Sequence, residues 1–408
     1  METINHGLKK NTGYDNKVAI RKCDSYIKAD VIDAIEKCVA EVGGFESFIG
    51  NASNILLKPN LLSAIPPEHA VTTHPVFIES IIEIIKKTAN RPVKITIADS
   101  PGVAVKHTKK DLEKLYEICG LSYLGNIEGV TLNLDSSFSQ VSFKEGKVIK
   151  QLEIIKPVLD ADVIINIPKL KTHSLTRMTG AVKNMFGTIY GRSKTVLHTK
   201  FIDVEKFNEM LLDIYLSKPP ALNIMDGILG LEGEGPGASG NPRKTGLVLA
   251  STNGIAMDNV LAHLMGFENK NLPLIKCAAA RELTGTDLSE IEIAGGSLEE
   301  FVIKGFRLPK NTPFDRISKN RFLSTYVFPF IRNTLAVSPY QNPVKCTNCN
   351  TCIKICPEKA ITANNKKLVF DYKKCIRCYC CSEMCQYGAI DLKYSGLGNL
   401  IFRQKPLK

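Results

Sequence analysis

Eight cysteines near the C-terminal end stand in two runs with the same spacing, C-x2-C-x2-C-x3-C. The second run repeats the first after 29 residues, and the two read "CTNCNTCIKIC" and "CIRCYCCSEMC". This interval lets one tight loop present three thiolates to a 4Fe-4S cubane, while the fourth cysteine leaves toward a second cluster. Zinc is the competing metal, but two interleaved sets of four thiolates favour iron and sulfur. The spacing therefore predicts two 4Fe-4S clusters.

Because the fourth cysteine crosses over, each predicted cluster takes three ligands from one run and one from the other. The first cluster is expected at Cys346, Cys349, Cys352 and Cys385. The second is expected at Cys375, Cys378, Cys381 and Cys356. The ninth cysteine of this region, Cys380, has no assigned role and is expected to be a spare thiol packed near a cluster.

At these positions residues 338–393 resemble the bacterial two-cluster ferredoxins. The resemblance implies low-potential, one-electron 4Fe-4S centres in a small βαβ-type module. One difference is that Pro357 follows the first run, whereas Gln386 stands in the equivalent place after the second. Ligation is expected to survive this difference, because proline shapes the exit turn and is not a ligand.

Polar side chains follow several apolar segments in the first two thirds of the chain. Lys58 and Asn60 follow one such segment, and Asp99 and Ser100 follow another. The densest group follows "DVIINIP" and consists of Lys169, Lys171, Thr172, His173, Arg177, Lys183 and Asn184. Ligands of open α/β sheets bind beyond the carboxyl ends of the strands, so these residues are expected to converge on one cleft.

The chemistry of this group is that of an anion site, because lysine and arginine supply positive charge and hydrogen-bond donors. His173 is the side chain among them that changes protonation near neutrality. The competing interpretation of Lys169 and Lys171 is an ordinary solvated loop. A glycine-rich segment, "MDGILGLEGEGPGASG", adds Asp226, Glu232 and Glu234 as possible bases or metal ligands.

Roles are predicted for these residues on that basis. The catalytic candidates are His173, Lys171, Asp226 and Glu234. The substrate-binding candidates are Lys58, Asn60, Lys169, Lys183, Asn184, Gly233 and Gly235, the two glycines because they permit close backbone approach to an anion.

The elements that must position these residues alternate between strand and helix patterns. Strand-like "KVAIRK", "NILLKPN" and "VKITIADSPG" are each followed by a helical pattern, at residues 27–42, 75–89 and 109–120. This order predicts an α/β domain with a mainly parallel sheet and flanking helices. A small α+β, ferredoxin-like domain is expected after it.

Domain limits are predicted from where periodicity fades. An α/β domain is expected over residues 1–310, a linker over 311–340, the two-cluster domain over 341–393 and a basic tail over 394–408. The segments "KPN", "PKLKTH", "KNMFG", "MDGILGLEGEGP" and "AMDNVLAHLMGF" resemble the family called domain of unknown function 362, over residues 15–305. That resemblance implies an iron–sulfur-linked metabolic enzyme, without a reaction to carry over.

The formal net charge of +12 is not accompanied by a zinc finger, an aromatic-basic sheet or an arginine-rich run. It therefore favours an anionic small molecule or an acidic redox partner protein over nucleic acid. No signal peptide is recognised, and the longest apolar stretch, residues 322–337, is interrupted by Pro329 and Arg332, so no transmembrane segment is expected. A reducing cytoplasm suits the cysteine cluster.

These observations favour a cytoplasmic oxidoreductase that passes single electrons between the clusters and an anionic substrate in the N-terminal domain. No GxGxxG or Walker sequence is present to indicate a bound nucleotide. Two alternatives stay open: an electron-carrying adaptor for a partner enzyme, and a non-redox acid-base enzyme whose clusters are structural. A divalent metal in the N-terminal domain also stays open.

Overall fold

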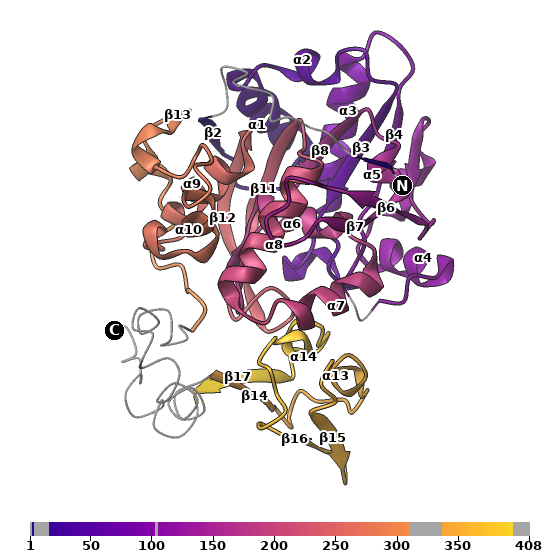
Figure 1. Ribbon diagram of the computed structural model, residues 1–408. Helices are drawn as coiled ribbons and strands as arrows, with labels where there is room; N and C mark the ends of the chain where they lie inside the picture. The colour runs from indigo at the N-terminus through magenta and orange to yellow at the C-terminus, as the bar shows by residue number, and fades with distance from the viewer. Residues whose placement is uncertain (1, 4–15, 103–104, 311–336, 395–408) are drawn as a thin grey trace.

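The computed structural model describes residues 2–3, 16–102, 105–310 and 337–394 (Figure 1). Most of the predicted linker and of the basic tail lie outside the described residues, as does the apolar stretch before Val337. Within the described parts of the chain, no helix is long and apolar enough to cross a membrane.

The large domain is built on a mixed, mainly parallel sheet, which confirms the predicted fold class. Its strands run in the order β13-β2-β12-β11-β8-β3-β4-β5, with β9 beside β11 and β10 beside β9. The pairs β11·β8, β8·β3, β3·β4 and β4·β5 are parallel. The strands are β2 (Lys17–Lys22), β3 (Asn54–Pro59), β4 (Lys94–Ile97), β5 (Val130–Leu132), β8 (Val163–Ile167), β9 (Lys169–His173), β10 (Arg177–Thr179), β11 (Leu222–Gly233), β12 (Gly240–Ser251) and β13 (Glu292–Ala294).

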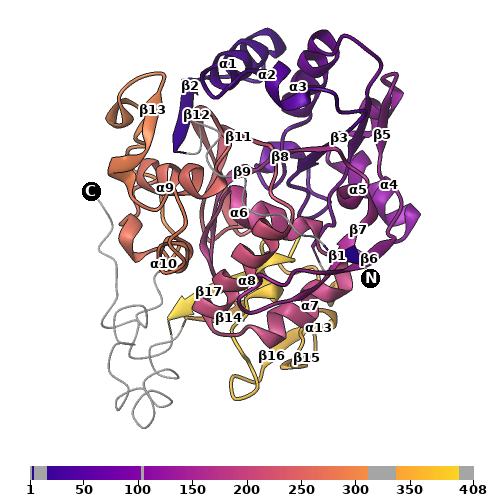
Figure 2. The same ribbon diagram turned by 45° about the horizontal axis from the view of Figure 1, so that its top comes forward.

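Helices cover both faces of this sheet (Figures 1 and 2). One face carries α1 (Lys28–Glu41), α2 (Phe45–Ile49), α3 (Pro75–Thr88) and α4 (Lys109–Ile118). The other carries α5 (Lys156–Leu159), α6 (Ala181–Asn184), α7 (Gly191–Lys200), α8 (Val204–Ser217), α9 (Gly254–Leu264) and α10 (Pro273–Ala279). A small sheet consists of β1 (Glu2–Thr3), β6 (Phe138–Ser142) and β7 (Gln151–Ile155), of which β6 and β7 pair antiparallel.

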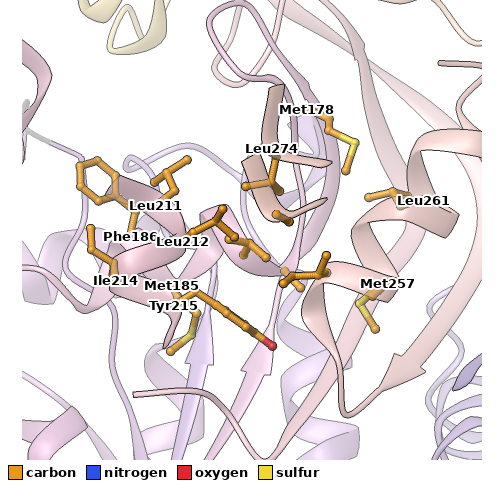
Figure 3. Packing of buried hydrophobic residues seen from close by; sticks show 14 of the residues in the cluster. Met178, Met185, Phe186, Leu211, Leu212, Ile214, Tyr215, Met257, Leu261 and Leu274 are labelled. Carbon is orange, nitrogen blue, oxygen red and sulfur yellow. The ribbon is translucent and has the colours of Figure 1, made fainter. Parts of the chain in front are cut away.

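Successive side chains along the strands pack alternately into two separate cores, one on each face of the sheet. In β3, Leu56 joins the core under α6–α10, whereas Ile55 and Leu57 join the core under α1–α4. Successive side chains of a strand point to opposite faces, so a sheet covered on both faces needs near-continuous apolar strands. Figure 3 shows part of the first core, where Met185, Tyr215 and their neighbours interdigitate.

Two segments differ from the prediction. The residues after β8, expected in a loop, form strand β9, and all five are buried. The glycine-rich segment is mostly the paired strands β11 and β12. Gly227 and Gly230 allow this, because a Cβ at either would crowd the backbone of Leu247 or the side chain of Leu170.

The cysteine-rich domain is small and has short antiparallel sheets. It pairs β14 (Val337–Gln341) with β17 (Ile390–Tyr394) and β15 (Ile361–Asn364) with β16 (Lys367–Phe370). Two one-turn helices, α13 (Thr351–Lys354) and α14 (Cys380–Glu383), each follow a cysteine loop. α14 faces the large domain, and the β15–β16 hairpin points away from it (Figure 1).

Candidate functional site: a cavity beside the second cysteine run

The cysteines of each predicted ligand set lie together. Cys352 interacts electrostatically with Cys385, Cys349 and Cys346. In the other set, Cys381 interacts with Cys378, Cys375 and Cys356, and it also interacts with Cys352 of the first set. Ligation by these sets remains a proposal, but the structure brings each fourth cysteine to the partner run, as the crossed arrangement requires.

The two cysteine loops have the same backbone conformation. Positive φ angles occur at Asn348 and Asn350 in the first loop and at Arg377 and Tyr379 in the second, at equivalent positions. The N–H groups of Ala360 and Ala389 donate to the Sγ atoms of Cys356 and Cys385, each at 3.2 Å. Such N–H···S bonds are among the interactions that tune cluster potentials, so this chain fits two 4Fe-4S centres.

A cavity of about 70 Å³ lies where α14 meets the large domain. We call it the shared cavity; its walls come from both domains and comprise Asn60, Leu62, Asp99, Ser100, Gly102, Lys171, Thr179, Lys183, Asn184, Phe186, Gly187, Lys194, His198, Pro236, Cys380, Glu383 and Met384. It opens beyond the carboxyl ends of β3 and β4, the place where open α/β sheets bind ligands. Its volume suits a small molecule or several waters.

Three lysines reach the shared cavity without a carboxylate hydrogen-bonded to them. Lys171 Nζ donates to Asn60 Oδ1 (2.8 Å) and to the Val71 carbonyl (2.9 Å). Lys194 Nζ donates to the carbonyls of Ser100 and Pro101. Burial lowers the pKa of Lys171 and the pKa of Lys194, each to about 7. The positive charge of Lys183 also lowers the pKa of both lysines.

Lys183 is the least satisfied of the three. Among the described residues its ammonium has no hydrogen bond or ion pair, only a cation–π contact with Phe186 at 5.8 Å from the ring centroid. Burial lowers its pKa, against the attraction of Glu383. A mostly buried cation of this kind is costly unless a ligand supplies the missing anion.

Lys58, also predicted to bind substrate, is already paired. Its Nζ lies 2.9 Å from Asp99 Oδ1, with both side chains buried. The other Asp99 oxygen accepts the Leu61 N–H at 2.6 Å. Lys58 therefore fixes the Asp99 wall of the cavity rather than presenting a free charge.

A chain of buried amides holds the cavity floor. Asn60 Nδ2 donates to Asn184 (2.9 Å), Asn184 Nδ2 to Asn166 (2.8 Å), and Asn166 Nδ2 to Asn223 (2.9 Å). With its donor used in this way, Asn60 turns its Oδ1 toward Lys171. The chain orients two predicted residues, Asn60 and Asn184, and connects them to the central strands.

Lys169 and Asp226 do not reach the shared cavity. They form a fully buried ion pair with Nζ and Oδ2 2.7 Å apart. The Tyr26 hydroxyl donates to Asp226 Oδ1 (2.8 Å) and accepts from Lys169 (2.8 Å). Because each charge is satisfied within this group, the pair ties strands β9 and β11 to the segment before α1.

Glu234 and the two predicted glycines also lie outside the cavity. Glu234 accepts the Lys310 N–H at 3.1 Å, and burial raises its pKa. The Gly233 N–H donates to the Arg307 carbonyl (2.7 Å), and Gly235 packs against Thr172, where a side chain has no space. Neither glycine N–H faces the cavity lining, so the structure places them in packing roles.

His173 stands behind the cavity wall. Its Nδ1 accepts the Leu175 N–H at 3.0 Å, so the neutral ring carries its hydrogen on Nε2, which faces Glu383 Oε1 at 3.6 Å. Burial lowers the pKa of His173 to about 4. Burial alone would raise the pKa of Glu383, but His173, Lys183 and His198 hold it well below its usual range.

The lining residues that were not predicted as site residues include Lys194, His198, Cys380, Glu383 and Met384. Lys194 and His198 are four residues apart on α7 and so share one face, a spacing visible in the sequence. The other three belong to α14 or follow it directly. Their position opposite the lysines depends on domain packing, for which the sequence carried no signal.

The fold and the cysteine sets define a two-domain protein: an α/β domain joined to a 4Fe-4S dicluster domain, a combination that suggests electron transfer. Residues 55–263 match DUF362, a domain of unknown function, and residues 338–386 match the 4Fe-4S dicluster domain. The first match covers just over half of the 408 residues, so the chain belongs to the DUF362 family.

Similar proteins include "Thylakoid-associated protein sll1697" of Synechocystis sp., 28% identical over 78% of this chain and 97% of that protein. "Putative oxidoreductase UacF" of Escherichia coli is 36% identical over 53 residues, 12% of this chain and 8% of that protein. Among solved structures, the lactate racemase apoprotein of Thermoanaerobacterium thermosaccharolyticum aligns at 16% identity and a TM-score of 0.34, over 52% of this chain and 50% of that chain.

Proposed function

We propose that this protein is an iron–sulfur oxidoreductase that exchanges single electrons with a small anionic molecule bound in the shared cavity. The observation that carries the proposal is that α14 contributes to both sites. It contains the predicted ligand Cys381 and also Cys380 and Glu383, which line the cavity. A molecule in the cavity would lie next to the second cysteine set.

The cations of the cavity support an anionic molecule. Lys171, Lys183 and Lys194 face it with hydrogen bonds only to neutral groups or with none, while Asp99 is neutralised by Lys58. Glu383 is the remaining carboxylate of the lining. The surplus of ammonium groups in a largely water-excluded space favours an anion through charge-assisted hydrogen bonds.

Lys171 and Lys194 are suited to move protons as well as to bind. A pKa of about 7 leaves each partly protonated near neutrality, as a general acid or base requires. The clusters, when bound, would supply or accept the electrons. In this proposal a lysine ammonium gives up the proton that accompanies each electron onto the substrate, and regains it from solvent.

His173 has a different role here from the predicted one. Its Nδ1 is occupied by backbone N–H groups and it does not line the cavity, so it is proposed to orient Glu383. Lys169, Asp226 and Glu234 are proposed to support the fold around the site.

The electron partner is proposed to be a separate protein that docks at the first cysteine run. Cys349 is exposed there, just before α13. We propose a reducing cytoplasm as the location, because the closely spaced cysteines, none of which forms a disulfide, suit cluster ligation there.

The test is an anaerobic screen of small carboxylates, phosphates and sulfur oxyanions against dithionite-reduced, cluster-loaded protein. We expect at least one anion to reoxidise the clusters, followed by their visible absorbance, and Lys183→Gln to raise its KM. If no anion reoxidises the clusters but a redox protein does, the adaptor interpretation replaces ours. Turnover of an anion with unchanged clusters would instead favour the acid-base enzyme.

A further inference from the structure

Three potential metal ligands meet in the shared cavity outside the eight proposed cluster cysteines. His198 comes from α7, whereas Cys380 and Glu383 come from α14, so both domains contribute. One ligand atom from each side chain lies within 4.8 Å of the other two, and all three residues are buried. Figure 1 shows α7 and α14 next to each other at this boundary.

Two of these side chains have another polar partner: Cys380 hydrogen-bonds with the predicted cluster ligand Cys378, and Glu383 faces His173. The buried Nδ1 of His198 has no hydrogen-bond partner among the described residues. Its ring is held by Phe186 and Phe207, with centroids 5.7 and 4.8 Å away. Cys380 belongs to neither predicted ligand set, because each set is complete with four other thiolates. An imidazole nitrogen without a hydrogen-bond partner, next to a thiol and a carboxylate, is typical of a metal-binding site rather than of core packing.

We propose that His198, Cys380 and Glu383 bind one divalent metal ion of the zinc class, with its remaining coordination position open to the shared cavity. Thiolate, imidazole and carboxylate are the three ligand types that zinc accepts, and three protein ligands with one open position are typical of catalytic zinc sites. Magnesium and calcium are disfavoured, because they prefer an all-oxygen shell.

The geometry needs only a small adjustment. Metal–ligand bonds of about 2.0–2.3 Å give a tetrahedral edge of roughly 3.3–3.8 Å, about 1 Å less than the largest separation here. The proposed site requires the Cys380 and Glu383 side chains to rotate about their own bonds by enough to close this difference. His173 Nε2–H, facing Glu383 Oε1, then orients the ligating carboxylate, as outer-shell partners commonly do.

The charge balance also favours this arrangement. A thiolate and a carboxylate neutralise a divalent ion, so the nearby lysines do not face a net positive site. Lys171, Lys183 and Lys194 then favour an anion at the open position. This last step rests on the proposed function, whereas metal binding itself does not.

The test is zinc binding by the full, cluster-loaded protein under anaerobic conditions, measured by calorimetry and by elemental analysis after gel filtration. We expect one zinc per chain, with iron unchanged at about eight per chain. The zinc K-edge spectrum should show one sulfur at about 2.3 Å and nitrogen or oxygen ligands at about 2.0–2.1 Å. No substrate or turnover is needed, so this result is independent of the redox screen.

Variants supply the controls. His198→Gln and Glu383→Gln should each weaken zinc binding tenfold or more without loss of iron. His263→Gln, a change of the same type on the partly exposed face of α9, should leave it unchanged. The proposal is overturned if wild-type protein binds no zinc, if His198→Gln binds it equally well, or if the spectrum shows four sulfur ligands. Loss of iron in Cys380→Ser would also overturn it, because Cys380 would then belong to a cluster.

Discussion

At the scale of single residues, the shared cavity is distinguished by buried ammonium groups that the protein does not neutralise. Two other buried lysines are paired with carboxylates, Lys58 with Asp99 in the cavity wall and Lys169 with Asp226 outside the cavity. A buried charge without a partner destabilises the folded state. Lys183, which is partly buried and has no ion pair among the described residues, is therefore where we propose that an anion binds.

Lys183→Met tests this interpretation, because it removes the charge and keeps an apolar stem. Sulfate affinity, measured by calorimetry on the full chain, should fall by roughly 1.5–3 kcal/mol, the contribution of a charge-assisted hydrogen bond. The Tm without sulfate should rise, because an uncompensated buried charge is lost. Lys110→Met, at an exposed position, should change neither. A lower Tm together with unchanged sulfate binding would show that Lys183 is structural.

The pH dependence of the same binding depends on Lys171 and Lys194. Both ammonium groups lose their proton as pH rises through about 7, so sulfate affinity should fall there. The pKa of an unfolded lysine is near 10.5, so between about 7 and 10.5 the unfolded chain binds more protons. In that window the free energy of unfolding should rise with pH, as part of the burial penalty disappears.

Lys171→Met should reduce the change of sulfate affinity with pH. Sulfate should still bind, because Lys194 and Lys183 remain. The other charges that Lys171 senses, Glu383, Asp99 and Lys169, keep their places in this variant. A titration that is flat across neutral pH in the wild type would contradict the assignment.

At the scale of elements, apolar periodicity predicted strands β2, β3 and β4 and helices α1, α3 and α4, and it failed where the buried residues are polar. β9 reads as a polar loop because two of its five buried residues are lysines. α7 has no apolar stripe, because its buried face includes Lys194 and His198 beside Leu197. Both exceptions line the site or stand directly behind it. Asn60, Lys171, Lys183 and Asn184 were recognised because they follow apolar strands, whereas the α14 residues were not.

Gly187, between α6 and α7, lines the cavity at a point where the side chains of Asp99 and Lys58 approach the backbone closely. A Cβ there would overlap the Asp99 carboxylate and the Lys58 ammonium. Gly187→Ala should therefore cost about 3 kcal/mol or more in the free energy of unfolding, the usual effect of disrupting a buried ion pair. Denaturant unfolding measures this. Gly125→Ala, where the added methyl meets only ordinary contacts, is the matched control, and an equal loss in both variants would refute the explanation.

At the scale of the whole molecule, the two domains have separate cores but a common site. The two large core clusters contain no residue beyond Leu308, while the cysteine-rich domain has small clusters of its own. The described contacts between the domains are both polar, such as Lys310 Nζ to the Leu392 carbonyl (2.9 Å), and apolar, such as Leu175 against Val337 and Leu392. The sequence predicted two domains from length and periodicity, but their mutual placement depends on side chains distant along the chain.

A chain truncated after Lys310 should consequently fold without the clusters. We expect a cooperative denaturant transition and native near-ultraviolet circular dichroism, because both large cores stay complete. The Leu175 side chain loses its apolar partners Val337, Tyr379 and Leu392, and Gly102 loses its contact with Met384. A broad, non-cooperative transition would show that the large domain depends on the cysteine-rich domain.

The central claim is that an anion in the shared cavity lies beside one cluster and not the other. Potentiometric titration of the cluster-loaded protein, followed by electron paramagnetic resonance with and without sulfate, tests it directly. A nearby negative charge disfavours the added electron, so sulfate should lower the midpoint potential of one cluster, and Lys183→Met should abolish the shift. Two potentials that sulfate leaves unchanged, or moves equally, would contradict the account.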